Sequence, residues 1–532
     1  MSAIATPRLL WLILGILTVL RLIVSAHAEL TPDESYYFLW SERMDISFYS
    51  KGPGIAATIW LGTHLFGAKE LGVRVFSPLL ALGTSVLIFS FARRLYDERV
   101  GFWAALTINL VPIFNAGSVL MTIDPLSIFF WTAALYTTWL ALERSPDFSR
   151  WWPLTGALIG LGFVCKYTNA MQLLSIVLLL AFTGRYRREL VRPGFWSMLA
   201  AFLPFTLPPI IWNAQHDWIT LAHLSARGGL QKAFRVDFAE LGTFVGQHFG
   251  AYSPLVFAAL LVATVWAFPQ VRHHFKPRFL LFFALPLWAM YLWLALKQAG
   301  EANWTAPAMV SLTILAVALW HERVQASATA RRFAATALAV ALVLSLLILD
   351  TELLRRVGAP ISYDIDPSKR LRGWRTAAEM LEKERAEFET QNGAPVFLIA
   401  NSYGTAAALA FYMRDKRVEG PRHPPIYFPE SQELENQFSF WPRYDEFITA
   451  SPEALAAEPS RDAYFTEQQG INPFHGRTAL YVTDRAEERA PSSIKGGFER
   501  VEVIACIDQK RRGLPLRQWR IFACYNYRSL PL

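Results

Sequence analysis

Apolar runs alternate with short charged loops over the first 350 residues. A run of about 20 apolar residues is long enough to cross a bilayer as a helix, with some tolerance for tilt. Two of these runs, 151–166 and 168–183, are short and nearly continuous. The pattern predicts about eleven membrane-spanning helices, near 8–25, 71–92, 100–117, 124–142, 151–166, 168–183, 194–212, 251–268, 279–297, 305–320 and 333–350.

The pattern changes at about residue 350. A helical period runs from Thr376 to Glu389, and four β-rich runs cover 395–400, 478–482, 501–506 and 519–525. Helices mixed with short strands are typical of a small α/β domain. We therefore expect a mostly α, polytopic membrane helix bundle over residues 1–350 and a soluble α/β domain over residues 351–532. The bundle includes a first outer loop, 26–70, with amphipathic helices.

Composition supports a membrane protein and excludes a nucleic-acid binder. The 532 residues are 53% hydrophobic and 18% charged, whereas a soluble chain carries about 25% charged residues. The net charge of +8 lies mainly in the loops between apolar runs. Membrane lipids, and not nucleic acid, are therefore the expected surroundings of the basic residues.

The basic residues fall in loops that share one side of the membrane if the spans alternate. Positively charged loops are cytoplasmic, so we expect a cytoplasmic N-terminus, outer loops at 26–70, 213–250 and 298–304, and a C-terminal domain outside. The basic residues concerned are Arg93, Arg94, Arg99, Arg144, Arg150, Arg185, Arg187, Arg188, Arg192, Arg272, Lys276, Arg278, Arg323, Arg331 and Arg332.

The N-terminus also resembles a signal peptide. Arg8, the apolar stretch and Ala26-His27-Ala28 fit a cleavable leader, but the stretch is long for one, which favours an uncleaved first span. Either reading leaves the first loop outside.

Two cysteines flank a predicted β-hairpin in the C-terminal domain. Cys506 and Cys524 form a disulfide in one interpretation, which an oxidising compartment would permit, and are two free thiols in the other. Spacing alone does not decide between them.

The first outer loop begins with two adjacent carboxylates. Asp33 and Glu34 follow Thr31-Pro32, a pattern typical of a helix start with acids in its first turn. A catalytic pair fits the same residues at a membrane surface. The aromatic residues 36–40 behind them favour a helix lying on the membrane.

Lys51 lies in the segment SKGPG of the same loop. Glycine and proline expose the backbone there and leave the lysine flexible, so its ammonium group is suited to binding a lipid phosphate. The alternative is a structural lysine, whose methylene groups lie on apolar surface and whose ammonium group reaches water.

Further charged and aromatic residues are expected at the outer ends of later spans. Asp124 begins the fourth span, either as a functional carboxylate or as a helix N-cap. Lys166-Tyr167 lies between two spans, and Lys166 pairs either with Asp124 or with an anionic ligand. Arg227, in SARGGL, and Asn303-Trp304, in EANWTAPA, complete the set.

These segments together resemble a known group of enzymes. DESYYFLWS, SKGPGIA with LGTHLFGAKELGVRVFS, LMTIDPLSIFFW, CKYTNA and EANWTAPA occur in order, each on the expected side. The set is similar to the bacterial GT-C glycosyltransferases of the protein-mannosyltransferase and aminoarabinose-transferase type, families 39 and 83. The similarity extends weakly into the outer domain through LRGWRTAAE, NSYGTAAALAFYM and NQFSFWP.

The resemblance implies transfer of a sugar from a polyprenyl-phosphate donor to a lipid, glycan or protein acceptor, on the outer face of a bacterial inner membrane. Asp33 matches the family's catalytic acid and is expected to act as general base in an inverting displacement. Asp124 matches the second acid. Lys51, Lys166 and Arg227 are expected to contact the donor phosphate, with Tyr167, Asn303 and Trp304 as further binding residues.

One departure concerns donor binding, because many family members have His-Pro-Pro where this chain has Lys-Gly-Pro at Lys51. No cofactor is expected to be required. A divalent metal on Asp33, Glu34 and Asp124 is an alternative that we do not favour.

A transporter or flippase for a lipid or solute is the competing interpretation. Transporters commonly show internal repeats and ionisable groups near the membrane midplane. This chain shows no repeat, and its charged motifs lie at the ends of the spans, which favours the enzyme.

Overall fold

The computed structural model describes residues 6–231, 236–356, 358–359, 361–414, 423–431, 433–445, 472–485 and 489–528. The predicted loop 213–250 and the predicted domain 351–532 each lie partly outside the described residues. The chain divides into two compact units, and the division cuts the first outer loop. The first unit comprises Met1–His27 and Asp45–Leu353, and the second comprises Ala28–Met44 and Leu354–Leu532.

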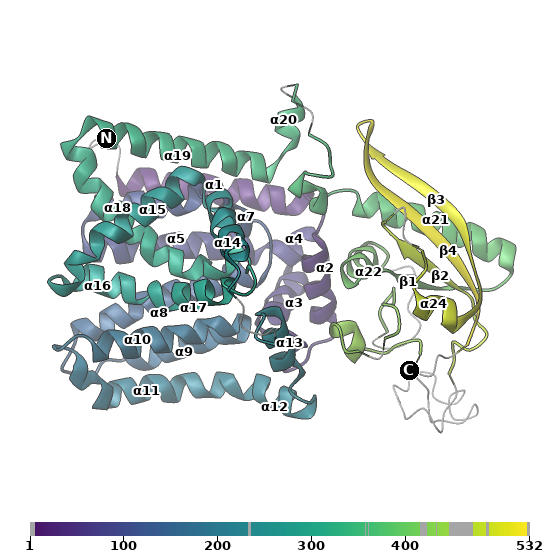
Figure 1. Cartoon of the computed structure of the whole chain (residues 1–532), viewed down its shortest axis with the longest axis horizontal. Helices are drawn as coiled ribbons and strands as arrows, with labels where there is room; N and C mark the ends of the chain where they lie inside the picture. The colour runs from purple at the N-terminus through teal and green to yellow at the C-terminus, as the bar shows by residue number, and fades with distance from the viewer. Residues whose placement is uncertain are drawn as a thin grey trace. The chain divides into compact units, whose positions relative to one another are not determined.

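The first unit is a helix bundle (Figure 1). Within the described residues, seven helical segments are long and apolar enough to cross a membrane. They establish a multi-pass membrane protein. The segments are α1 (Pro7–His27), α4 with α5 (Glu70–Arg74, Phe76–Leu95), α8 (Ile123–Glu143), α11 with η3 and α12 (Pro193–Phe202, Leu203–Thr206, Leu207–Gln215), α16 with α17 (Phe275–Phe282, Leu285–Ala295), η5 with α18 (Ala302–Thr305, Ala306–Ala326) and α19 (Ala328–Leu349).

The other four predicted spans coincide with shorter or broken apolar helices, so the number of eleven spans stays a prediction. Val111 is extended and Pro112 starts a new helix, which splits the third predicted span into α6 (Glu98–Leu110) and α7 (Pro112–Gly117). The fifth and sixth are α9 (Trp151–Cys165) and η1 with α10 (Tyr167–Ala170, Met171–Ala181). The eighth, α15 (Pro254–Ala267), meets α14 (Phe238–Ala251) at a bend of 113°.

The other helices described between residues 45 and 356 are short. α3 (Gly54–Phe66) buries Ile55 and Ile59 and exposes Trp60 and Leu65, as expected of an amphipathic helix in the first loop. The remaining ones are η2 (Arg187–Val191), α13 (Ile219–Arg227), η4 (Pro269–Arg272) and α20 (Glu352–Arg356).

Close backbone contacts tighten the bundle. Gly156 of α9 lies against the carbonyl oxygen of Met198 in α11, and a Cβ at this glycine would overlap that oxygen. Helices associate in a membrane mainly through van der Waals packing. A small residue such as glycine strengthens this packing because it lets two backbones approach closely.

The second unit contains a four-stranded sheet of order β1-β2-β4-β3, which confirms the predicted α/β character. β1 (Phe397–Ala400) is parallel to β2 (Ala479–Thr483), and β4 (Leu514–Tyr527) is antiparallel to β2 and β3 (Phe498–Arg511). The yellow hairpin of Figure 1 is β3 and β4. In the described part of this unit, the helices are α2 (Pro32–Glu42), η6 (Pro367–Leu371), α21 (Trp374–Asn392), α22 (Tyr403–Tyr412), η7 (Gln437–Phe440) and α24 (Ser492–Gly497).

The predicted β-hairpin forms, but its cysteines do not pair. Cys506 lies opposite Arg520, and Cys524 lies opposite Val501, so several residue pairs separate the two thiols along the ladder. Each residue pair adds about 3.4 Å, which exceeds the reach of a disulfide. Both cysteines are free thiols, and Cys524 is buried.

The helix α2 belongs to the second unit. Its aromatic residues Tyr36, Phe38 and Trp40 are buried: the Phe38 ring packs on Phe411 of α22, with centroids 4.9 Å apart, and the Tyr36 hydroxyl accepts a hydrogen bond of 2.5 Å from the backbone N–H of Gln437. The prediction that these rings lie on the membrane is therefore corrected. They form part of the core of the second unit.

A buried carboxyl group, Glu430, lies beside the aromatic core of this unit. Its Oε2 accepts a hydrogen bond of 2.8 Å from the Tyr527 hydroxyl, and its backbone N–H donates to the Tyr444 hydroxyl. Burial raises the pKa of the Glu430 carboxyl to about 8, and the hydrogen bond from Tyr527 opposes this only in part. The folded protein therefore holds a proton on Glu430 that the unfolded chain releases above its ordinary pKa.

We expect the second unit to lose stability as pH rises. Between the ordinary carboxyl pKa and about 8, the folded state binds more protons at Glu430 than the unfolded state, so the free energy of unfolding falls, by on the order of a few kcal/mol. Thermal unfolding of the full chain at pH 5 and pH 8, compared with Glu430→Gln, measures this. The variant should flatten the pH dependence. An unchanged difference between the two pH values would contradict the assignment.

Candidate active site

The segment SKGPG is fixed against the end of α9. A Cβ at Gly52 would overlap the carbonyl oxygen of Val164, and one at Gly54 would overlap the sulfur of Cys165. The carbonyl of Lys51 accepts hydrogen bonds from the Phe48 N–H (3.0 Å) and the Ser47 hydroxyl (3.2 Å). The glycines therefore serve close packing as well as exposure of the lysine, and the backbone of Lys51 is held in place.

Tyr167 joins this turn to the end of α9. Its hydroxyl lies 3.3 Å from the Ser47 hydroxyl, and Ser47 is fully buried. Because Ser47 also contacts the carbonyl of Lys51, the predicted binding residues Lys51 and Tyr167 share one hydrogen-bonded partner.

Asp124, Lys166 and Asn303 form a compact network. Lys166 Nζ lies 2.7 Å from Asp124 Oδ1, and Asn303 Nδ2 donates to Asp124 Oδ2 at 2.6 Å. Lys166 Nζ also donates to the Asn303 carbonyl at 3.3 Å. The expected pairing of Asp124 with Lys166 is present. The N-cap of α8 is Thr122, whose side chain accepts from the Asp124 N–H, so Asp124 lies in the first turn and is not the cap.

Burial makes the charges of this network energetically costly unless they are paired. Lys166 is only 7% exposed, and a buried charge costs several kcal/mol unless a partner and further hydrogen bonds compensate. Asn303 supplies both an amide donor to Asp124 and a carbonyl acceptor to Lys166, so each charged group has two polar partners. The starts of α8 and η5 and the end of α9 must therefore meet at one point.

Arg227 and Trp304 extend the cluster. The Arg227 guanidinium lies 5.5 Å from the centre of the Trp304 ring, within the range of a cation–π contact. Arg227 is exposed, so its charged group can also contact a ligand. Trp304 follows Asn303 directly, so the arginine lies beside the ion-pair network.

A histidine that the sequence interpretation missed lies among these cations. The His223 ring packs on Tyr49 with centroids 4.7 Å apart, and burial, with the positive charges of Lys51 and Arg227, lowers the pKa of His223 to about 4. His223 is therefore neutral at physiological pH. The sequence could have pointed to His223, because it lies four residues before Arg227 and residues four apart share a helix face.

Seven of the nine predicted site residues thus lie in the first unit, and their contacts link them. Lys51 and Tyr167 connect through Ser47, Lys166 precedes Tyr167, and Asp124 and Asn303 bind Lys166. The geometry concentrates positive charge beside one carboxylate.

Asp33 and Glu34 lie in the second unit, and their environments differ. Glu34 is fully buried and closes a capping box with Thr31: its Oε2 accepts from the Thr31 N–H (2.9 Å) and hydroxyl (3.0 Å). This geometry favours a structural role for Glu34. Asp33 is half-buried in the same turn, and the capping box does not use its carboxylate.

The segment around Asp33 is held from both ends by the second unit. Before the helix, the Leu30 N–H donates to the Tyr412 hydroxyl at 2.9 Å, and Glu29 accepts from the Trp374 N–H at 2.6 Å. After it, Arg43 donates to the His423 carbonyl at 2.8 Å. Residues distant in sequence therefore set the position of Asp33.

A cavity of about 200 Å³ adjoins the ion-pair network in the first unit. Asp124 and Asn303 form part of its wall, and Ser85 and Asn109 form another part. Its remaining lining is mostly apolar and includes Phe114 and Ile128. The cavity thus combines hydrogen-bonding groups with apolar faces.

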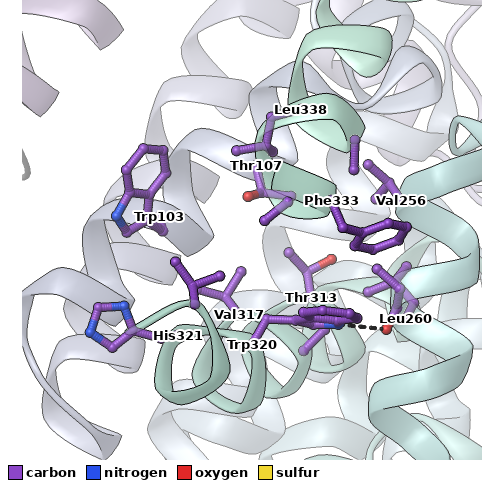
Figure 2. Close-up of a pocket in the computed structure, with 15 residues that line it drawn as sticks. Trp103, Thr107, Val256, Leu260, Thr313, Val317, Trp320, His321, Phe333 and Leu338 are labelled. Carbon is purple, nitrogen blue, oxygen red and sulfur yellow. Dashed lines mark hydrogen bonds between the residues drawn. The ribbon is translucent and has the colours of Figure 1, made fainter. Parts of the chain in front are cut away.

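A second pocket, of about 110 Å³, is apolar (Figure 2). Trp103, Trp320 and Phe333 line it, and the Trp320 N–H donates to the Ala259 carbonyl at 3.1 Å. Along α18 it begins at Thr313, about three helical turns beyond Asn303. His321 is its one titratable lining residue, so the pocket offers few groups for acid–base chemistry.

Within the described part of the chain, no group of three or more His, Cys, Asp and Glu side chains is arranged to hold a metal ion. The expectation that no metal is required stays a prediction.

Comparison with known proteins supports the resemblance predicted from the motifs. Residues 50–212 match the family described as dolichyl-phosphate-mannose-protein mannosyltransferase. The lipid A galacturonosyltransferase RgtD of Rhizobium johnstonii is 26% identical over 302 residues, which cover 54% of this chain and 60% of that protein. The undecaprenyl phosphate-alpha-4-amino-4-deoxy-L-arabinose arabinosyl transferase of Pseudomonas aeruginosa is 29% identical over 219 residues, or 38% of this chain and 40% of that one.

The chain therefore aligns with between two fifths and three fifths of the length of these relatives. The fold comparison extends further. The crystal structure of ArnT from Cupriavidus metallidurans bound to undecaprenyl phosphate superposes with a TM-score of 0.59 at 16% identity, and covers 96% of this chain and 98% of that chain. The likeness in fold confirms a helix bundle with a small additional domain.

We expect Gly52→Ala to disturb the site through packing alone. The added Cβ would meet the backbone of Val164, so α9 and the Lys51 turn must move apart, which costs about 1–3 kcal/mol. Thermal unfolding of the purified protein measures the loss. Gly184→Ala is the matched control, because no atom lies within 4 Å of a Cβ there. Equal stability of the two variants would contradict the packing argument.

Proposed function

The chain carries the fold of the GT-C glycosyltransferases of the protein-mannosyltransferase and aminoarabinose-transferase group, and on that premise we propose that it transfers a sugar from a polyprenyl-phosphate donor. The network of Asp124, Lys166 and Asn303, with Lys51 and Arg227, is the observation that carries the proposal. A cation cluster suits a phosphate leaving group because it stabilises the charge that develops there.

Asp33 acts as the general base. It accepts the proton of the acceptor hydroxyl, whose oxygen attacks the anomeric carbon of the donor sugar. The bond between this carbon and the phosphate oxygen breaks, and its electron pair leaves with the polyprenyl phosphate. Direct displacement inverts the anomeric configuration. The capped start of α2 supports this role, because it fixes the turn while leaving the Asp33 carboxylate outside the capping box.

Lys51, Lys166 and Arg227 stabilise the departing phosphate. Asp124 and Asn303 orient Lys166, since both hydrogen-bond to it or to each other. Tyr167 holds the Lys51 turn through Ser47, and Trp304 packs against Arg227. Two kinds of relative support a phosphate-linked carrier: one named for an undecaprenyl-phosphate sugar, and one whose structure holds undecaprenyl phosphate.

The reaction takes place on the outer face of a bacterial inner membrane, with the N-terminus cytoplasmic and the C-terminal domain periplasmic. The distribution of basic loops supports this orientation. The acceptor is a lipid, a glycan or a protein; RgtD, which acts on lipid A by its name, favours a lipid among these. The transporter alternative has no comparable support.

Replacing Asp33 by Asn should abolish transfer. The amide cannot take the acceptor's proton, so the rate should fall by roughly 10²- to 10⁴-fold with donor binding retained. The assay uses purified full-length protein, undecaprenyl-phosphate sugars and lipid A. Glu42→Gln, at the far end of the same helix, is the matched control and should stay active. Persistent transfer by Asp33→Asn would show that the base lies elsewhere.

Replacing Lys51 by Ala should mainly weaken donor binding. Loss of one charged hydrogen bond to the phosphate corresponds to roughly a tenfold rise in the donor KM, with a smaller effect on kcat. Titration with undecaprenyl phosphate measures the affinity directly. Lys69→Ala, an exposed lysine of the same loop, is the control. Unchanged affinity in Lys51→Ala would remove this lysine from the phosphate site.

A further inference from the structure

The apolar pocket of Figure 2 lies where four helices of the first unit meet. α6, α15, α18 and α19 each contribute lining residues, and Ser327 joins the last two helices. Trp103 and Phe333 lie on opposite sides of the space, and small residues such as Ala316 and Ala334 also line it. Small side chains beside large rings leave room unfilled, and voids of this kind are few in well-packed protein interiors.

Hydrogen bonds of the lining residues favour a hydrocarbon occupant. The Thr313 hydroxyl donates to the Met309 carbonyl at 2.8 Å, and the Trp320 N–H donates to the Ala259 carbonyl at 3.1 Å. An occupant therefore meets mainly carbon atoms, and a polar one would lose its hydrogen bonds to water. An apolar cavity of about 150 Å³ holds a benzene ring, so the 110 Å³ here admit roughly four carbon atoms of a chain.

The pocket has the length of a lipid tail in one leaflet. Along α18 its lining runs from Thr313 to Val324, a distance of roughly 16 Å in a helix. Half of the hydrocarbon core of a bilayer is about 15 Å thick. Val324 lies in the last turn of α18, so an acyl chain can follow this helix from its end toward the middle of the membrane.

Arginines lie at the end of the pocket where α18 turns into α19. Residues 321–332, HERVQASATARR, contain three arginines and one glutamate. Arg323 lies between the lining residues His321 and Val324 in the chain, and Arg331 Nε donates to the Val324 carbonyl at 3.4 Å. Positive charge is therefore concentrated at one end of an apolar pocket.

An aromatic stack connects Arg323 to the wall of the pocket. Its guanidinium lies 3.6 Å from the centre of the Trp266 ring, which packs on Trp320 with centroids 5.0 Å apart. Trp320 in turn packs on Phe333, also at 5.0 Å. Arg323 Nη1 donates to the Leu319 carbonyl at 3.0 Å, and a guanidinium has several further N–H donors, so it can bind a phosphate at the same time. Tryptophans are typical of the depth at which lipid headgroups lie.

We propose that the pocket between α6, α15, α18 and α19 binds one acyl chain of an anionic phospholipid, whose phosphate lies against Arg323 and Arg331. Basic pockets between membrane helices select anionic headgroups in this way. The chain fills the space between α19 and the other three helices, and the bound lipid thereby stabilises their packing. In the orientation proposed above, the lipid belongs to the cytoplasmic leaflet. The proposal does not depend on the transfer reaction.

Headgroup selectivity is tested by native mass spectrometry of the purified, delipidated full-length protein. Phosphatidylglycerol and phosphatidylethanolamine with identical acyl chains are titrated in turn, because the first is anionic and the second carries no net charge. Phosphatidylglycerol should bind about tenfold more tightly. Equal affinities of the wild type for the two lipids would overturn the inference.

Arginine variants locate the headgroup. Arg323→Gln combined with Arg331→Gln should remove most of the preference for phosphatidylglycerol and change the affinity for phosphatidylethanolamine by less than about twofold. Arg188→Gln, an exposed arginine of another basic loop, is the matched control and should keep the preference. A double variant with the full preference would overturn the inference, because the phosphate would then lie elsewhere.

Filling the pocket tests the position of the tail. Ala334→Leu adds an isopropyl group to the lining and should lower the affinity for both lipids by about tenfold, whereas Ala335→Leu, at the next and exposed position of α19, should not. Unchanged affinities in Ala334→Leu would overturn the inference. Undecaprenyl phosphate is the third ligand: tighter binding of this carrier than of phosphatidylglycerol, lost in Ala334→Leu, would make its tail the occupant and also overturn the inference. The wild-type titrations and the arginine variants keep the proposal testable even if Ala334→Leu fails to fold.

Discussion

A buried ion pair between Asp124 and Lys166 is the constraint on which the first unit depends. The two groups lie 2.7 Å apart, and Asn303 satisfies their remaining hydrogen-bonding capacity. Separating them would leave a charge inside the bundle at a cost of several kcal/mol. The starts of α8 and η5 and the end of α9 are therefore tied together. The extended backbone at Lys166, which ends α9 after fifteen residues, follows from this requirement.

The second constraint is steric. Gly52 and Gly54 bring the Lys51 turn onto Val164 and Cys165, next to the residue of the ion pair. The end of α9 thus positions two cations: Lys166 through the ion pair of its side chain, and Lys51 through the packing of its turn on Val164 and Cys165. In the second unit, the long-range hydrogen bonds of Leu30, Glu29 and Arg43 play the corresponding part for Asp33.

Much of this could be predicted from the sequence, because long apolar runs, basic loops and strand patterns are local signals. The α/β domain and the hairpin were predictable in this way, whereas the pairing of Asp124 with Lys166 was one of two open interpretations. The lengths of the helices were not fully predicted: α6 ends at Leu110, before Pro112, and α9 ends at Cys165, next to the lysine that pairs with Asp124. The burial of Tyr36 and Phe38 was also missed, because their partners, Gln437 and Phe411, lie 401 and 373 residues further along the chain.

The assignment of Ala28–Met44 to the second unit affects how hybrids of such proteins should be built. A chimera joined at the apparent boundary near residue 350 would pair one parent's α2 with another parent's α22 and η7, and their aromatic surfaces would no longer match. A crossover that also exchanges residues 28–44 keeps each interface native. Inheritance of Asp33, the proposed general base, and of the C-terminal domain is thereby linked, although the helix bundle of Asp45–Leu353 separates them in the chain.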